Sequence, residues 1–420
     1  MSGTLNANYV QADVGTNLYL NSGLNSGNVI VSTPIVANTV TSNTGAPLVL
    51  QSNNTTAITV DTSQNVTFAG SVNAPNSFGF KNRIINGGMV IDQRNAGASV
   101  TVGSSGGYYP VDRFYGQAAV ASKFTLQQST DVPSGQGFLN SIVATSSSAY
   151  SITTNDYFII RQAIEGLNCY DFMFGSANAK TVILSFWVKS SLTGTFSGHL
   201  TNSSSARWYP FTYTVSSANT WTQISITIAG DQSGTWLTNN NTGIFVGWSI
   251  GTGSGTQATA NTWTASTGIA ATGSVNVVAT NGATLYITGV QLEKGSTATS
   301  FDYRPYGTEL QLCQRYFVAL ANQADSFLGS GFGAGGGNVY CNGPFPVTMR
   351  ASPTLSYQGS FTGTAVTTAA IGGSITAIAN QGSGINGWYA IITGSGTYPS
   401  QTYVMVRGST SFALTASAEL

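Results

Sequence analysis

Between residues 181 and 292, short segments dominated by β-branched and aromatic residues follow one another, separated by Gly, Asn and Ser. They cover residues 181–188, 208–215, 221–228, 244–250, 274–278 and 285–292. Segments of this kind between turn residues predict β-strands, and no comparably long helical pattern interrupts them. The sequence therefore predicts an all-β fold, with a central β-sandwich of jelly-roll type over residues 81–306.

The first 80 residues contain a repeat with an offset of thirty positions. Residues 7–22 recur as residues 37–52, and the identical pairs are Ala7 and Ala37, Asn8 and Asn38, Val10 and Val40, Gly15 and Gly45, Leu18 and Leu48, Leu20 and Leu50, and Ser22 and Ser52. Apolar residues alternate within each copy, which predicts short strands. Because one copy cannot bury its own apolar face, we expect copies from identical chains to wind into a trimeric β-shaft over residues 1–80. A flexible linker is the alternative.

The last part, residues 307–420, is rich in Gly, Ala, Ser and Thr and predicts a separate C-terminal β-domain. A short helix is expected at 308–316, with Thr308 as N-cap and with Leu310, Cys313 and Phe317 on one face. Strands are expected at 344–350 and 403–407, and residues 329–337 read as a glycine-heavy loop. With so few charges and large apolar residues, this domain is expected to pack against copies of itself.

Charge and histidine content exclude several classes of function. The chain has 14 Lys and Arg, 14 Asp and Glu, a formal net charge of zero, and only 7% charged residues. It therefore lacks the basic surface that a nucleic-acid-binding protein needs. His199 is the single histidine, which excludes metal centres and catalysis that need two. The apolar segments are too short to span a membrane, and the first residues lack the pattern of a signal peptide.

The three cysteines, Cys169, Cys313 and Cys341, are odd in number and far apart. This spacing fits neither a disulfide framework nor a metal site. We expect reduced thiols packed as small apolar groups, in a protein that is made in a cytoplasm.

No catalytic motif stands out. The carboxylates that the fold could bring together are scattered singly along the chain: Asp92, Asp112, Asp156, Asp171, Asp231 and Glu293. A glycosidase-like pair among them stays open, because spatial pairing is invisible in a sequence. The preferred interpretation is that they form local ion pairs and turn caps. His199 has no flanking acid or nucleophile, so no catalytic residue, metal or cofactor is expected.

Aromatic residues in polar surroundings are the better candidates for a binding site. Trp236 and Trp263 lie among Asn, Thr, Ser and Gly, and Tyr108, Tyr109 and Trp208 are further candidates. An aromatic ring beside amides and hydroxyls can stack on the C–H face of a sugar while the polar groups bond its hydroxyls. These five residues are the predicted glycan-binding set, although each taken alone also fits a sandwich core. Trp187, in an apolar strand, is expected in the core.

A series of motifs resembles a jelly-roll domain found in bacteriophage tail-fibre proteins. It runs through residues 81–87, 92–94, 112–114, 221–223, 230–236, 289–295, 301–305 and 309–316 in this order. The 289–295 segment also resembles carbohydrate-binding modules, and the repeat ending at 65–71 is similar to shaft repeats in fibres of phages that infect marine bacteria and cyanobacteria. The matching motifs look structural, with Arg83, Asp92, Arg94, Asp112 and Glu293 bracing the sandwich.

The resemblance implies a homotrimeric virion fibre, assembled in the host cytoplasm, whose N-terminal region attaches to other tail or head proteins and whose distal part meets host-surface polysaccharide. Some such modules hold a structural calcium, but no acidic cluster here demands one. The expected function is therefore non-enzymatic adhesion, without nucleic-acid binding or membrane insertion. One rival is a purely structural fibre or connector without receptor contact. A less favoured rival is a tailspike-type polysaccharide depolymerase.

Overall fold

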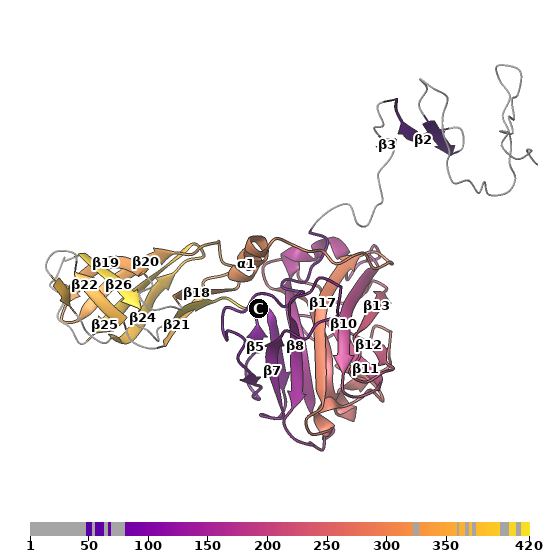
Figure 1. Ribbon diagram of the computed structural model, residues 1–420, viewed down its shortest axis with the longest axis horizontal. Helices are drawn as coiled ribbons and strands as arrows, with labels where there is room; N and C mark the ends of the chain where they lie inside the picture. Colours follow the sequence, from indigo (N-terminus) through magenta and orange to yellow (C-terminus); the bar gives the residue numbers. More distant parts are fainter. Residues whose placement is uncertain are drawn as a thin grey trace, which may run out of the picture. The chain divides into compact units, whose positions relative to one another are not determined.

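The computed structural model of the chain describes residues 48–52, 55–62, 66–68, 80–321, 327–358, 361–365, 369–371, 375–394, 403–408 and 413–420. In the described part of the chain, strands predominate and helices are few and short, so the predicted all-β class is confirmed. The chain divides into two compact units, Met1–Ala74 and Pro75–Leu420. Figure 1 draws the sandwich strands in purple to orange and the C-terminal strands in orange to yellow.

The first unit contains a three-stranded antiparallel sheet of β1 (Leu48–Ser52), β2 (Thr55–Val60) and β3 (Val66–Phe68). Leu48 lies opposite Val60, and Leu50 lies opposite Ile58, so alternating apolar residues share a face. The strands predicted in residues 48–68 are thus confirmed. The first copy of the repeat, residues 7–22, lies outside the described residues, and the trimeric shaft stays a prediction.

Two six-stranded antiparallel sheets form the sandwich in the second unit. The first sheet has the order β13-β10-β17-β8-β7-β4 and comprises β4 (Val100–Thr101), β7 (Phe124–Ser129), β8 (Ser141–Ser146), β10 (Val182–Ser190), β13 (Thr222–Ile228) and β17 (Thr284–Lys294). The second has the order β12-β11-β14-β9-β6-β5 and comprises β5 (Tyr108–Val111), β6 (Phe114–Ala118), β9 (Tyr157–Glu165), β11 (Gly194–Asn202), β12 (Trp208–Val215) and β14 (Thr242–Thr252). The predicted central β-sandwich is therefore confirmed.

The core lies between the two sheets and follows the period of two along each strand. On β10, Leu184, Phe186 and Val188 are buried in it, and the Phe186 ring meets Trp248 of β14 edge to face at 5.5 Å. Each such side chain contributes roughly 1.5–3 kcal/mol by leaving water. The expectation that Trp187 is a core residue is wrong, because it alternates to the outer face of the sheet and is only half-buried.

Short elements connect the sheets. They are a parallel pair, β15 (Gln257–Ala258) and β16 (Ala270–Ala271), and four 3-10 turns, η1 (Gly166–Asn168), η2 (Tyr170–Phe172), η3 (Ser254–Thr256) and η4 (Val277–Ala279). The prediction of a strand at residues 274–278 is wrong. Val277 and Val278 are buried as part of η4, so their apolar character reflects burial and not strand pairing.

The predicted helix exists as α1 (Tyr306–Gln314) but begins earlier, with Pro305 in place of Thr308 at the N-cap. The Glu309 amide donates to the Pro305 carbonyl at 3.0 Å, which closes the first turn. Cys313 is fully buried among Ile85, Ile91 and Tyr316. Phe317 is buried too, but it lies in the following strand.

Two C-terminal sheets complete the chain. A three-stranded sheet has the order β18-β27-β21, with β18 (Phe317–Ala321), β21 (Thr354–Gln358) and β27 (Ala413–Ser417). A seven-stranded sheet has the order β23-β22-β26-β19-β20-β25-β24, with β19 (Phe327–Gly335), β20 (Asn338–Pro344), β22 (Phe361–Ala365), β23 (Ala369–Ile371), β24 (Ile375–Ser383), β25 (Gly387–Gly394) and β26 (Tyr403–Gly408).

Two C-terminal expectations need correction, and one is confirmed. The glycine-heavy loop predicted at 329–337 is mostly strand β19, and the strand predicted at 344–350 is irregular after Pro344. The strand predicted at 403–407 corresponds to β26.

All three cysteines are free and buried, as expected. In the described part of the chain, the helices are all too short or too polar to cross a membrane.

Candidate functional site

Trp236 and Trp263, which lie in different connections of the sandwich, come together in space. Trp236 follows β13, and Trp263 lies between β15 and β16. Their ring centroids are 5.4 Å apart at an interplanar angle of 86°, and both rings are half-buried. The two tryptophans that the sequence favoured as surface residues therefore form one pair.

Two further rings complete what we call the tryptophan cluster: Phe174, Tyr209, Trp236 and Trp263. Phe174 meets Trp236 at 5.0 Å and Trp263 at 5.8 Å, both edge to face. Tyr209 lies on β12 and contacts Trp263 at 5.1 Å. The cluster packs against the sandwich core, so its exposed ring surface is held by a rigid support.

The loop that carries Trp236 is fixed by side chains from the end of β11 and from the turn that connects β11 to β12. Arg207 donates to both carboxylate oxygens of Asp231, at 2.7 and 2.8 Å. Asn202 donates to the Thr235 carbonyl at 2.9 Å, and the Trp236 indole donates to the Ser233 carbonyl at 3.0 Å. These bonds hold the ring in place before any ligand arrives, which lowers the entropy cost of binding.

A glycine lets Trp236 settle against the sandwich. Gly175 has a φ of 81°, in the left-handed region that favours glycine, and a Cβ there would lie 2.6 Å from the Gly234 carbonyl oxygen and 3.0 Å from the Trp236 ring. A side chain at position 175 would therefore displace the ring.

The loop that carries Trp263 extends the edge of the second sheet. Trp208 and Thr264 exchange two backbone hydrogen bonds of 2.9 Å, and the Asn261 amide donates to the Pro210 carbonyl at 2.7 Å. The Trp263 indole donates to the Ala229 carbonyl at 2.7 Å. Both indole N–H groups of the pair are thus bonded to the protein, and the ring surfaces are what the pair offers to a ligand.

The surroundings of the pair are polar and neutral. Exposed amide and hydroxyl side chains on the same two loops are Gln232, Ser233, Thr235, Asn261 and Thr262. Arg207 and Asp231, which brace the Trp236 loop, bond to each other. Half-buried aromatic rings beside neutral donors and acceptors are suited to a ligand with both an apolar face and hydroxyl groups.

Trp208, Tyr108 and Tyr109 do not join this cluster. The expectation that Trp208 presents a ring at the surface does not hold, because the side chain is 5% exposed and its indole donates to the Ser205 carbonyl. Its backbone instead positions the Trp263 loop. Tyr108 and Tyr109 lie on β5, which is the opposite edge strand of the sheet from β12.

Tyr108 and Tyr109 are both half-buried. Tyr108 packs against the sandwich core, and Tyr109 lies under the Arg94 guanidinium, which is 4.2 Å from the ring centroid. Burial, reinforced by the nearby Glu419 carboxylate, raises the pKa of Tyr109 above its usual range.

The six scattered acids each have partners of their own. Asp92 accepts backbone hydrogen bonds from Arg94, Asn95 and Gly97, and Asp156 accepts one from Thr153. Asp112, Asp171 and Asp231 pair with arginines, and Glu293 is bonded to Thr299. These are the contacts of turn caps and braces. Among the described residues, no group of three or more His, Cys, Asp or Glu could hold a metal ion.

His199 is buried on β11 and bonded to the Ile269 carbonyl at 2.8 Å. Because a carbonyl only accepts, the Nδ1 atom carries the proton. Burial lowers the pKa of His199 to about 3, so the ring is neutral near pH 7.

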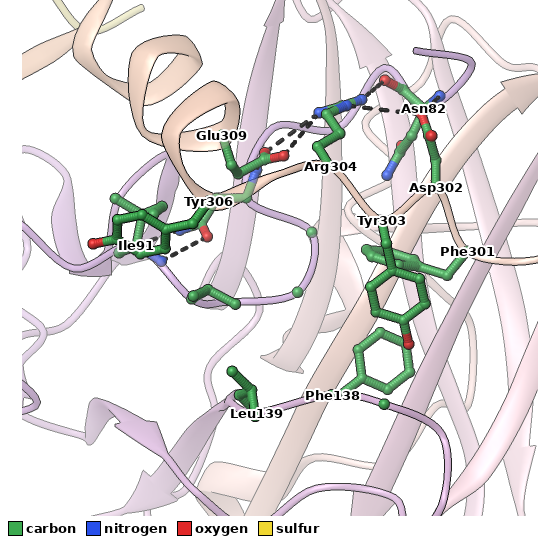
Figure 2. A pocket seen from close by; sticks show the side chains of 15 residues that line it. Asn82, Ile91, Phe138, Leu139, Phe301, Asp302, Tyr303, Arg304, Tyr306 and Glu309 are labelled. Carbon is green, nitrogen blue, oxygen red and sulfur yellow. Dashed lines mark hydrogen bonds and ion pairs between the residues drawn. The ribbon is translucent and has the colours of Figure 1, made fainter. Parts of the chain in front are cut away.

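A separate pocket of about 210 Å³ is lined by rings that the sequence had not suggested as site residues. Phe138, Phe301 and Tyr303 contact one another at 4.8 to 5.6 Å, and Leu139 and Tyr306 lie on its wall, 70% and 62% exposed. Figure 2 shows the three rings gathered on one side of the hollow. Phe301 and Tyr303 belong to the motif at residues 301–305, which the sequence comparison with tail-fibre domains interprets as structural.

The polar wall of this pocket is engaged in internal bonds. Arg304 contacts Glu309 at 3.3 Å and Asp302 at 3.7 Å and donates to the Asn82 carbonyl, and Figure 2 shows it between these groups. The Asn82 side chain bonds the backbone of β17. With these groups occupied, the pocket offers mainly apolar surface, which suits an apolar group better than a sugar.

No protein-family model matches the chain, and no curated protein matches it. Several solved structures share a likeness with about half of it. One is the enzymatically active domain of tailspike protein 4 from bacteriophage CBA120, with 14% identity and a TM-score of 0.27 over 51% of this chain and 22% of that chain. Another is a family 11 carbohydrate-binding module from Clostridium thermocellum in complex with a β-1,3-1,4-mixed-linked tetrasaccharide, with 13% identity and a TM-score of 0.24 over 49% of this chain and 100% of that chain. A third is the N-terminal cellulose-binding domain of Cellulomonas fimi β-1,4-glucanase C, with 11% identity and a TM-score of 0.24 over 48% of this chain and 91% of that chain.

Proposed function

We propose that this chain is a non-enzymatic, adhesive fibre protein of a bacteriophage, and that its sandwich binds neutral cell-surface glycan at the tryptophan cluster. The observation that carries the proposal is the pair Trp236 and Trp263, held half-buried on two braced loops. No cofactor or metal takes part.

The chemistry of the cluster supports a neutral saccharide in particular. A pyranose ring has an apolar C–H face that packs on an aromatic ring, and its hydroxyls exchange hydrogen bonds with amide and hydroxyl side chains. The Arg207 side chain lies against Gly234 of the Trp236 loop, and its guanidinium is bonded to Asp231. An acidic sugar would thus find no open charge partner in the cluster. Binding to a neutral sugar is also insensitive to salt.

The fibre and its trimeric state rest on the sequence resemblance of residues 81–316 and on the N-terminal repeat. A trimer would present three copies of the tryptophan cluster, and several fibres on one virion would present more. Weak binding at each site would then add up to firm adhesion, because linked sites raise the effective concentration. In this proposal the N-terminal region attaches to other virion proteins.

The proposal is tested by binding of the full-length protein to a panel of immobilised neutral and acidic polysaccharides, including that of a susceptible host. Trp236→Ala and Trp263→Ala are each expected to weaken binding at least about tenfold, equivalent to about 1.4 kcal/mol. Trp221→Ala is the matched control, since Trp221 is also half-buried but lies beside Tyr286, where its indole bonds Asp131. Near-ultraviolet circular dichroism checks that each variant is folded.

The rivals give different results in the same experiment. If wild type binds nothing on the panel, or if both cluster variants bind as wild type does, the adhesive function fails and a structural connector is favoured. If new reducing ends appear during incubation with the polysaccharides, the depolymerase is favoured.

A further inference from the structure

A row of residues crosses the outer face of the second sheet, on the side away from the sandwich core. Its members lie directly opposite one another on neighbouring strands: Pro210 on β12, His199 on β11, Gly247 on β14, Arg161 on β9 and Tyr115 on β6. Opposite residues share a face, and their chain neighbours Leu200 and Val246 are buried in the core. His199 is neutral near pH 7, so Arg161 carries the single charge of the row.

One end of this face is covered by the chain around β16. The Ile269 carbonyl bonds His199, and the Ala271 amide donates to the Ser197 hydroxyl at 2.7 Å, so this part of the chain lies over β11. His199 is fully buried beneath it, whereas Arg161 on β9 is only half-buried. The outer face is therefore partly open to solvent around Arg161.

The Arg161 guanidinium lies between two aromatic rings. Its carbon atom is 4.3 Å from the ring centroid of Phe245 and 5.2 Å from that of Tyr115. The group also has a hydrogen bond with the Tyr115 hydroxyl, and its Nε atom is buried without a partner. A guanidinium has five N–H donors in a planar fork, so one hydroxyl leaves others for a second acceptor. The rings thus hold Arg161 in place with part of its hydrogen-bonding capacity unused.

Arg161 differs in its partners from most other arginines of residues 81–316. The arginines that pair with a carboxylate are Arg83, Arg94, Arg113, Arg207, Arg304 and Arg315. Among the carboxylates that the structure describes, none pairs with Arg161. A cation that is partly removed from water is costly unless an anion compensates it. Arg161 is therefore suited to an oxyanion from outside the chain.

The nearby carboxylate does not compensate the charge of Arg161. Burial raises the pKa of Tyr115, and the positive charges of Arg161 and Arg113 act against that shift. The carboxylate that also acts on Tyr115 is that of Glu419, which is bonded to Arg113 and Arg94. The charge of Arg161 is thus available to attract an anion.

The side chains around Arg161 suit a sugar ring. Phe245 and Tyr109 supply half-buried rings, and the Tyr109 ring is 5.1 Å from that of Tyr115. Gln117 follows Tyr115 by two positions on β6, so its half-buried amide side chain lies on the same face. An oxyanion can accept two parallel hydrogen bonds from a guanidinium, while the C–H face of the sugar packs on a ring and its hydroxyls bond an amide.

We propose that Arg161 is the centre of a second binding site, for a saccharide that carries a carboxylate or sulfate group. The oxyanion bonds the guanidinium, and Phe245, Tyr109 and Gln117 contact the sugar to which it is attached. The site is separate from the tryptophan cluster, because β11 and β14 lie between β9 and β12, and the cluster lies at the β12 edge. It therefore takes the class of saccharide for which the cluster has no open charge partner.

The test measures binding of the full-length protein to pairs of oligosaccharides whose members differ only in charge. Uronate-containing oligosaccharides are paired with their carboxyl-reduced forms, and sulfated ones with their desulfated forms. In about 50 mM salt, at least one acidic member should bind at least about tenfold more tightly than its neutral partner, and this preference should shrink in about 500 mM salt. Arg161→Gln should abolish the preference.

Lys123→Gln is the matched control. Lys123 is also half-buried, and its Nζ atom is 4.7 Å from the Tyr150 ring centroid, so the variant removes one positive charge and one cation–ring contact elsewhere on the sandwich. It should keep the preference. Near-ultraviolet circular dichroism checks that each variant is folded. Arg161→Lys keeps the charge without the planar fork, should reduce the preference at least about threefold, and replaces Arg161→Gln if that variant does not fold.

The inference is overturned if wild type prefers no acidic member, or if folded Arg161→Gln keeps the preference. Inorganic sulfate that binds as tightly as the best acidic oligosaccharide would also overturn it, since the rings would then add nothing. The glycan proposal at the tryptophan cluster fails separately. Trp236→Ala should weaken binding of neutral polysaccharide and keep the preference for the acidic member, and Arg161→Gln should do the reverse.

Discussion

Asp112 and His199 are buried ionisable side chains whose pKa values shift in opposite directions. The pKa of Asp112 lies above its ordinary value, and that of His199 lies below its ordinary value. Burial raises the pKa of Asp112 to about 6, against the attraction of Arg94. Burial lowers the pKa of His199 to about 3. Each shift widens the pH range over which the folded protein prefers the neutral form, because a charge is costly away from water.

The two shifts have opposite effects on stability between about pH 4 and pH 6. Folded Asp112 keeps a proton that the unfolded chain releases, so its contribution to the free energy of unfolding grows as the pH falls through 6. The contribution of His199 is complete above about pH 6.5 and is lost as the pH falls, because the unfolded chain takes up a proton that the folded one refuses. Each slope is at most about 1.4 kcal/mol per pH unit, so the two nearly cancel.

This cancellation is tested with Asp112→Asn and His199→Gln, by urea unfolding at several pH values from 4 to 6.5. Relative to wild type, Asp112→Asn should lose stability more steeply on acidification, and His199→Gln should lose it less steeply. The other carboxylates are the same in all three proteins, so the difference in slope isolates each residue. Parallel curves for wild type and both variants would contradict the assignment.

At the residue scale, the sequence predicted part of the candidate site. Trp236 and Trp263 were identified because large rings in Asn- and Thr-rich loops have no strand pattern to bury them. Trp208 was misplaced because its neighbours look similar, and the loop that covers it comes from residues far along the chain. Phe174 has no distinguishing neighbours, so its role depends on a fold that the sequence alone does not provide.

At the element scale, strands with alternating or continuous β-branched residues were predictable, and the expected segment 208–215 coincides with β12. Glycine-rich and small-residue segments were not. β19 contains four glycines, yet pairing with β20 and β26 on both sides keeps it extended. A Cβ at Gly331 would lie 1.7 Å from the Tyr340 carbonyl oxygen, so glycine there reflects close approach of strands, which no local pattern reveals.

The segment after β27 joins the end of the described chain to the sandwich. Glu419 accepts hydrogen bonds from Arg94 at 2.7 Å and from Arg113, which is 2% exposed and lies over the Tyr316 ring at 3.6 Å. The Arg113 guanidinium also donates to the Ala163 carbonyl at 2.6 Å. A buried arginine of this kind depends on its carboxylate partner.

Glu419→Ala is therefore expected to reduce the free energy of unfolding by about 3–5 kcal/mol, because it leaves the buried Arg113 unpaired. Asp171→Ala is the control. Its partners Arg83 and Lys294 are 25% and 50% exposed, so the loss should stay below about 1 kcal/mol. Denaturant unfolding at pH 7 measures both variants, and equal losses would show that burial does not set the strength of the Glu419 contacts.

At the scale of the whole molecule, the few charged residues form ion pairs between positions that are far apart in the sequence. Glu165 on β9 bonds Arg315 after α1, and Arg94 bonds Glu419, 325 positions away. A sequence with 14 acids and 14 bases spread singly does not show which will meet, because each pairing depends on the completed fold. For the same reason, the sequence alone does not show that Phe174 and Tyr209 lie beside the two tryptophans.

The three free thiols lie in three different buried clusters: Cys169 in the sandwich core, Cys313 on the buried face of α1 and Cys341 in the C-terminal core. Burial raises the pKa of both Cys169 and Cys341 to about 12, and that of Cys313 well above its usual value. Since the thiolate is the reactive form, each cysteine should react with a thiol reagent only when its own cluster opens.

Pulses of a thiol reagent in rising urea, followed by mass spectrometry of the peptides, would give the order of opening. We expect Cys341 to react before Cys169, because in the described part of the chain its cluster is much smaller than the sandwich core. Native protein whose thiols all react at the rate of free cysteine would contradict this. Because each of these three clusters holds one thiol, the opening of the sandwich core, of the cluster at α1 and of the C-terminal core can be timed separately in a single unlabelled sample, including while the protein is attached to a surface and under load.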